Sequence, residues 1–187
     1  MSRCTFKFRL VPTRKQTELL SWTLSRCREL YNASLQHRRD AYCMAGKSVN
    51  YYDQANSLVE VKEVRPEYRD IHSQILQDVL RRTDKAFQAF FRRVKAGEEP
   101  GYPRFRGKGR YDSMMYSQYG NGAILSENTM HLSKVGAMKV VFHRPLEGTP
   151  KTVCVKRSST GKRVSGMWLY LVNGNQQHCL FLPNRLV

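Results

Sequence analysis

Apolar and polar residues alternate strictly near the beginning of the chain. Every second side chain is apolar, and those between them are threonine, lysine and arginine: Cys4, Phe6, Phe8 and Leu10 against Thr5, Lys7 and Arg9. Successive side chains of a strand point to opposite faces, so this pattern predicts a half-buried β-strand with a basic outer face. Pro12 ends the strand, because proline has no backbone donor for a sheet.

A helical period follows the first strand. Thr13 and Gln16 have the spacing of a capping box, and Gly46 is a typical residue to end a helix that runs to about Ala45. The apolar stripe predicts core residues at Leu20, Leu24, Cys27, Tyr31 and Leu35. On the opposite face we expect exposed cations at Arg26, Arg28, Arg38 and Arg39.

Two further helices are predicted before residue 100. Asn50 can cap a short helix from Tyr51 to about Glu63, and Arg65-Pro66 then interrupts the chain. A longer helix is expected from about Asp70 to Ala96. Its buried stripe would be Ile75, Leu76, Val79, Leu80, Phe87, Phe90 and Val94, and its other side carries Arg81, Arg82, Lys85, Arg92 and Arg93.

After residue 100 the pattern changes to short β-type runs separated by turn residues. These runs are 122–125, 130–132, 139–142 and 152–155, and further runs at 167–172 and 179–182 flank an Asn173-Gly174 hairpin signal. The first strand would pair most economically with this group. We therefore predict an α+β fold, in which a helical bundle is inserted in a small oligonucleotide-binding-like β-barrel that the last runs could close.

Charge narrows the class of partner. The chain of 187 residues has a formal net charge of +17, which favours a polyanionic partner. Nucleic acid is favoured over a membrane surface, because the cations do not lie along one amphipathic helix. The five cysteines include no C-x-x-C pair, and the histidines show no ligand spacing. We expect no metal, no cofactor and no membrane association, and scattered single thiols fit a reducing cytoplasm.

The stretch from Pro100 to Tyr116 carries the strongest chemical signal. Its first part interleaves cations with aromatic rings among glycines and prolines, and it has no acid before Asp112. Cations neutralise phosphates and aromatic rings stack on bases, which favours nucleic-acid binding over a basic surface turn. The candidate binding residues here are Tyr102, Arg104, Phe105, Arg106, Lys108 and Arg110.

An ordered set of motifs resembles a known family. The set comprises Phe8-Arg9-Leu10-Val11-Pro12-Thr13, Arg28-x-x-Tyr31-Asn32, Gly46-Lys47-Ser48-x-x-Tyr51, Gln74-x-x-Gln77-x-x-Leu80, Ala86-Phe87-x-x-Phe90-Phe91-Arg92, Gly101-Tyr102-Pro103-Arg104-Phe105, Leu132-Ser133-Lys134-Val135-Gly136 and Lys151-Thr152-Val153-x-Val155. Over residues 3–162 the chain resembles the amino-terminal half of TnpB, the OrfB "transposase" of insertion sequences. That family comprises RNA-guided nucleases related to type V CRISPR effectors.

The resemblance implies a wedge barrel, formed by residues 1–12 and 99–162, around a helical recognition domain of residues 13–98. Residues 163–187 diverge from the family. In the family these lobes hold guide RNA and the guide–target heteroduplex, and they read a short DNA motif, which implies RNA and DNA partners and a nucleoid-associated prokaryotic protein. Positions matching the motif-reading contacts are Tyr51 and Gln77, and Arg81, Arg82 and Lys85 add cations nearby. Without the resemblance, Tyr51 and Gln77 would be ordinary helix residues.

The family cleaves DNA with a RuvC-like domain whose carboxylates hold divalent metals, and this chain shows no match to that domain. It has no acid after Glu147, and Glu98-Glu99 is its only adjacent acidic pair. We expect that the chain alone does not cut. Two alternatives stay open: half of a split enzyme completed by a separate RuvC-bearing chain, and a decaying open reading frame.

Overall fold

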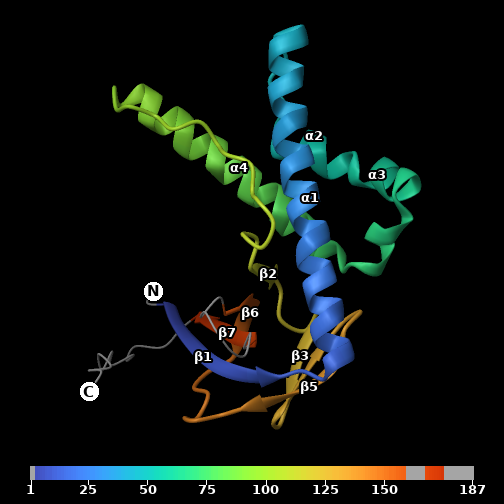
Figure 1. Ribbon diagram of the computed structural model, residues 1–187. Coiled ribbons are helices and arrows are strands. Elements are labelled where there is room, and N and C mark those ends of the chain that lie inside the picture. Colours follow the sequence, from blue (N-terminus) through green and yellow to red (C-terminus); the bar gives the residue numbers. More distant parts are fainter. Residues whose placement is uncertain (1–2, 159–166, 175–187) are drawn as a thin grey trace.

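The computed structural model describes residues 3–158 and 167–174, which form a curled sheet with a helical layer on one side of it (Figure 1). A long stretch of helices separates the first strand from the second along the sequence. In chain order the elements are β1 (Arg3–Val11), α1 (Arg14–Ala45), α2 (Tyr51–Asn56), α3 (Leu58–Val64), the 3-10 helix η1 (Pro66–Asp70), α4 (Ser73–Lys95), β2 (Ser113–Tyr116), β3 (Ala123–Ser126), β4 (Thr129–Leu132), β5 (Gly136–Val141), β6 (Pro150–Arg157) and β7 (Met167–Gly174).

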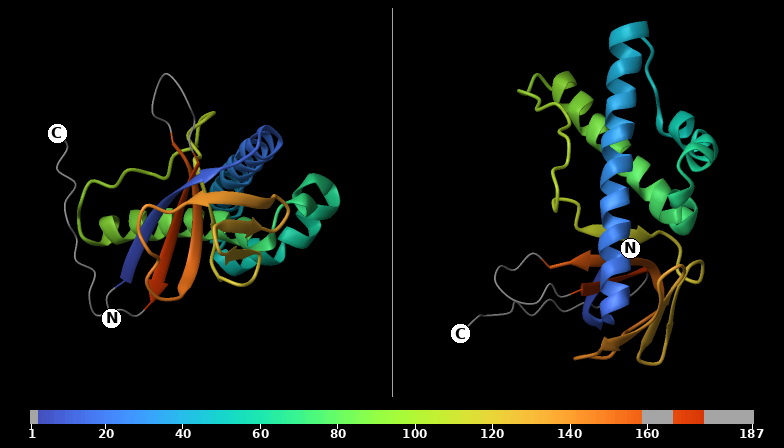
Figure 2. Two further views of the ribbon diagram at one scale, coloured as in Figure 1. Left: turned by 90° about the horizontal axis from the view of Figure 1, so that it is seen from below. Right: turned by 45° about the vertical axis from the view of Figure 1, so that its right-hand side comes forward.

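All strand pairs of the sheet are antiparallel, in the order β2-β6-β7-β1-β5-β4-β3. The sheet curls on itself into an incomplete barrel (Figure 2). Side chains buried inside it come from most of its strands, among them Phe8, Leu10, Met114, Met138, Val155 and Leu169. The fold is therefore a mixed helix and sheet architecture, as the change of hydrophobic period predicted.

Strand β1 lies in the middle of this sheet. The predicted alternation is confirmed, since Phe6, Phe8 and Leu10 are buried while the intervening residues are exposed. β1 pairs with β5 on one side and with β7 on the other. The expected pairing with the later strands is thus present, and β7 joins the barrel. The run predicted at 179–182 lies outside the described residues.

Helix α1 begins and ends as the sequence predicts. The Thr13 side chain accepts a hydrogen bond from the Gln16 amide, the Gln16 side chain accepts one from Thr13, and Gly46 ends the helix at φ +60°. All five predicted core residues of this helix are buried. α1 packs against α4, so these two helices form the frame of the helical layer.

The boundaries of the other elements differ from the predicted ones. The single helix expected at 51–63 is two helices, α2 and α3, with Ser57 between them. α4 begins later than Asp70, because residues 66–70 form η1, Ile71 is extended, and His72 caps the helix through its ring nitrogen. Strand β2 was not predicted, because its residues were interpreted as the end of the basic stretch. The other strands begin or end a few residues from their predicted bounds.

Several burial predictions for the helices were wrong. Arg38 was expected on the exposed face but is only 8% exposed, and Arg26 and Arg28 are half-buried. Phe90 is half-buried and Val94 is exposed, because the far end of α4 extends beyond the helices that cover its first half. No helix among the described residues is long and apolar enough to cross a membrane.

Candidate nucleic-acid interface

The segment between α4 and β2 carries the basic stretch and runs back beside α4 (Figure 1). It is attached to the helices at defined points. The Tyr102 ring lies edge-on to Phe87 and Phe90, with ring centroids 5.7 and 5.4 Å apart. Further along, Tyr111 is buried and its ring lies 6.2 Å from that of Tyr31. Although it has no regular secondary structure, the stretch is thus docked at both ends.

Asn32 of α1 holds the middle of this stretch. Its side-chain nitrogen donates to the Arg106 carbonyl at 3.0 Å, and its side-chain oxygen accepts from the Arg106 amide at 2.8 Å. The Arg106 guanidinium also lies over the Tyr31 ring, 5.7 Å from its centroid. These contacts account for Tyr31 and Asn32 of the Arg28-x-x-Tyr31-Asn32 motif, whose role in holding the loop was not predicted from the sequence.

The other predicted residues of the stretch point to solvent. Arg104, Phe105, Lys108 and Arg110 are exposed, and Tyr102 remains 44% exposed despite its ring contacts. Because the backbone of the loop is already fixed at several points, binding of a strand would cost less conformational entropy. The geometry therefore presents cations and aromatic rings on a partly preorganised segment.

The Arg82 side chain is engaged in contacts within the protein. It pairs with the buried Asp78 at 2.7 Å, donates to the carbonyl and hydroxyl oxygens of Ser113, and lies over the Tyr111 ring. Burial raises the pKa of the Asp78 carboxyl, and Arg82 opposes that shift. The prediction that Arg82 belongs to an exposed cationic face was wrong, because its charge is needed beside this buried acid.

The two positions matched to DNA-motif reading lie close to a third predicted residue. The Arg81 guanidinium is over the Tyr51 ring at 5.5 Å, and Gln77 lies one helical turn before Arg81 on α4. Tyr51 and Gln77 are half-buried, whereas Arg81 and Lys85 are exposed. The structure thus brings Tyr51 and Arg81 into contact on the helical layer, with Gln77 on the same side of α4.

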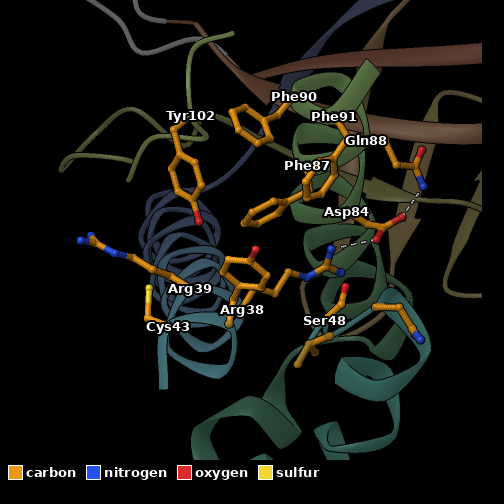
Figure 3. A pocket seen from close by; sticks show the side chains of 13 residues that line it. Arg38, Arg39, Cys43, Ser48, Asp84, Phe87, Gln88, Phe90, Phe91 and Tyr102 are labelled. Carbon is orange, nitrogen blue, oxygen red and sulfur yellow. Dashed lines mark hydrogen bonds and ion pairs between the residues drawn. The ribbon is translucent and has the colours of Figure 1, made fainter. Parts of the chain in front are cut away.

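A groove of about 790 Å³ lies between the far halves of α1 and α4. Figure 3 shows its aromatic wall, with Phe87, Phe90 and Phe91 of α4 and Tyr102 of the basic stretch. Such a volume is within the range of ligand pockets. The aromatic cluster at the end of α4 was the one feature of the sequence that pointed to this groove.

Arg38 forms the polar wall of this groove. Its guanidinium donates to Asp84 at 2.9 Å (Figure 3). It also donates to Gln54 at 2.8 Å and lies over the Phe87 ring. These contacts explain why a residue predicted to be exposed is buried. Arg39, the next residue, is exposed and also lines the groove.

The described residues also include free thiols and side chains of the types that bind metals. No group of three or more histidine, cysteine, aspartate or glutamate residues that could hold a metal occurs within 3–158 and 167–174. Cys27, Cys43 and Cys154 are free, and burial raises the pKa of the Cys27 thiol to about 12, so this thiol stays protonated at neutral pH. The exposed cations and rings are the chemical groups that can contact a polyanion.

Fold and surface together define a mixed α and β protein with a basic, aromatic surface. Residues 1–47 match the HTH_OrfB_IS605 family, which is described as a helix-turn-helix domain. The described part of this range forms β1 and the single long helix α1, and the next helix begins only at Tyr51.

Two curated relatives match most of the chain. The "Putative RNA-guided DNA endonuclease InsQ" of Escherichia coli (strain K12) is 30% identical over 157 residues, which are 82% of this chain and 37% of that protein. A "Putative RNA-guided DNA endonuclease" of Streptomyces pristinaespiralis is 31% identical over 163 residues, 84% of this chain and 39% of that protein. The chain spans less than two-fifths of the length of these relatives.

A solved structure has the same kind of fold. The cryo-EM structure of the Cas12f1–sgRNA–target DNA complex contains a chain that matches with a TM-score of 0.51 at 12% identity, over 95% of this chain and 49% of that one. The chain is therefore related to OrfB (TnpB) proteins of insertion sequences, and the resemblance that the ordered motifs indicated is confirmed.

The Asn32 clamp gives a prediction that involves no change of charge. Asn32→Ala removes both side-chain hydrogen bonds to Arg106 and should weaken the binding of a polyanion to the basic stretch about fivefold, since about 1 kcal/mol of loop anchoring is lost. Fluorescence anisotropy with labelled RNA measures the effect. The dependence of affinity on salt should not change, because no phosphate contact is removed. Asn56→Ala, at an exposed site on α2, is the matched control, and equal affinities of the two variants would contradict the role of the clamp.

Proposed function

We propose that this chain is the nucleic-acid-binding part of a transposon-encoded, TnpB-like system, which holds RNA and DNA and does not cleave DNA by itself. The observation that carries the proposal is the basic stretch, which is held at Tyr102, Arg106 and Tyr111 while its remaining cations and Phe105 face solvent. The relation to RNA-guided endonucleases supports RNA and DNA as the polyanions.

The two layers have separate roles in this proposal. The curled sheet serves as an oligonucleotide-binding-like wedge made of residues 1–12 and 99–162, with residues 163–187 contributing β7. The helices of residues 13–98 form the recognition unit. Tyr51 and Gln77 read a short DNA motif, since glutamine can pair with adenine through two hydrogen bonds and tyrosine offers a stacking face. The contact between Tyr51 and Arg81 supports a joint role for this cluster.

The environment of the acids supports binding without cleavage. Four of the six buried or half-buried carboxylates are engaged by arginines: Asp78 by Arg82, Asp84 by Arg38, and Glu29 and Glu67 by Arg26. Of the other two, Asp112 pairs with Lys156 and Asp40 accepts a hydrogen bond from Gln36. A two-metal phosphodiester cleavage site needs several carboxylates that converge on one point and are free to bind metal. Carboxylates committed to structural ion pairs do not provide such a site.

A second candidate is the recognition half of a split RNA-guided endonuclease. It is favoured by the share of each relative that the chain matches, 37% and 39%. In that case a separate chain bearing a RuvC domain would supply the metal-binding carboxylates.

Replacing Arg104, Arg106, Lys108 and Arg110 with alanine should weaken RNA binding by two to three orders of magnitude and leave the fold intact, because these side chains are exposed. For the unmodified chain, about six to eight phosphate contacts predict a slope of log K against log salt near −5 to −7, and the variant should lose about 3 of these units. The measurement is an anisotropy titration at several salt concentrations.

A control with the same charge shows whether position matters. Replacing Arg14, Lys15, Lys62 and Arg69 with alanine removes four cations from other parts of the helical layer and should change the affinity by less than tenfold. Equal losses in the two variants would mean that net charge, and not the basic stretch, determines binding. Unfolding of the first variant in a thermal melt would show that the stretch is structural.

Cleavage is tested with the purified chain, RNA from its own element, a matched DNA target and Mg²⁺ or Mn²⁺. The expected result is intact DNA. Cutting that disappears when one of the chain's own acids is replaced would overturn the proposal. Cutting that needs an added RuvC-bearing chain would instead establish the split enzyme.

A further inference from the structure

One face of the sheet is not part of the interface described above. On the adjacent strands β6, β7 and β1, alternate side chains point away from the barrel interior. Met167, Leu169 and Leu171 of β7 are buried, whereas Trp168 and Tyr170 between them are half-buried. The outward face of β7 therefore presents two large aromatic side chains.

Cations of the neighbouring strands surround these rings. In the strand register Lys7 is opposite Tyr170, and Trp168 lies between Arg9 of β1 and Lys156 of β6. The Lys7 ammonium is 4.1 Å from the centroid of the Trp168 ring and 5.9 Å from that of the Tyr170 ring. Lys7 and Arg9 are exposed, so both side chains can reach a phosphate.

The charge of this part of the sheet has one sign. β1, β5, β6 and β7 contain no acidic residue, and their cations are Arg3, Lys7, Arg9, Lys139, Lys151, Lys156 and Arg157. Asp112, just before β2, pairs with Lys156 at 3.4 Å. A strand surface of this kind favours a polyanion that also has flat apolar faces, as the unpaired bases of a single strand do.

We propose that Trp168 and Tyr170, with Lys7 and Arg9, form a stacking platform for unpaired bases of a single-stranded nucleic acid. Bases stack on the two rings, and the lysine and arginine pair with the flanking phosphates. A duplex cannot use the platform, because its base faces are already stacked within the helix. The inference rests on the proposed function and adds a second, single-strand-specific contact on the sheet.

Intrinsic fluorescence tests the platform directly, because the chain has only two tryptophans, Trp22 and Trp168. In Trp22→Phe protein, Trp168 is the sole reporter. Titration with oligo-U RNA or oligo-dT DNA of about ten nucleotides should quench its emission. The quenching should saturate at the same concentration as the anisotropy of a labelled oligonucleotide. A duplex of equal length should leave the emission unchanged. The RNA and DNA arms show which single strand is preferred.

Substitutions test the same contact independently of fluorescence. Trp168→Leu together with Tyr170→Leu should reduce affinity for the single strand at least tenfold while duplex affinity changes little, since each base–ring stack contributes substantially to binding. Trp168→Phe keeps an aromatic ring and should retain most of the affinity. This variant provides the test if the leucine variant does not fold. Its remaining tryptophan, Trp22, should show no quenching.

The outcomes separate this inference from the proposed function. Binding seen by anisotropy without a change in Trp168 emission overturns the platform and leaves the nucleic-acid-binding function standing. Equal quenching by duplex and single strand also overturns it. Emission that changes with protein concentration in the absence of oligonucleotide would assign this face to a second copy of the chain. The absence of all binding would count against the proposed function itself.

Discussion

The position of β1 between β5 and β7 is the constraint on which the rest of the structure depends. Its buried face of Phe6, Phe8 and Leu10 completes the barrel interior, so the start of the chain must meet strands that are formed more than a hundred residues later. Closing so long a loop has an entropic cost that rises only slowly with length, and burial of the apolar face offsets it. The helices between β1 and β2 consequently lie beside the sheet.

Packing of α1 against α4 then determines where the basic stretch runs. The Ser34 and Thr83 hydroxyls are 2.7 Å apart between the two helices, and Arg38 of α1 pairs with Asp84 of α4. Removing one partner of such a buried pair lowers the stability of the protein more than replacing both partners with apolar residues. These contacts therefore fix the register of the two helices. With the helices in register, Asn32 and the aromatic residues of α4 face the loop that they hold.

Periodicity in the sequence was sufficient for β1, for α1 with its caps, and for the apolar core residues of α1 and of the first part of α4, because only one face of each element can be buried there. It failed where tertiary contacts decide. The helical pattern places Arg38 and Arg82 on the surface. The structure instead pairs Arg38 with Gln54 and Asp84, and Arg82 with the buried Asp78. The platform at Trp168 depends on strand order, which alternation alone does not reveal. The exposed cations of the basic stretch were predictable, because glycine and proline exclude regular structure there.

The central claim is that aromatic residues of the basic stretch contact nucleic acid. The most direct measurement is ultraviolet crosslinking of bound RNA, with the linked residues identified by mass spectrometry. The account predicts crosslinks at Tyr102 and Phe105, which lie beside the exposed cations, and none at Tyr68, which is buried in the helical core. Crosslinks confined to other parts of the chain, with Tyr102 and Phe105 unmodified at saturating RNA, would contradict it.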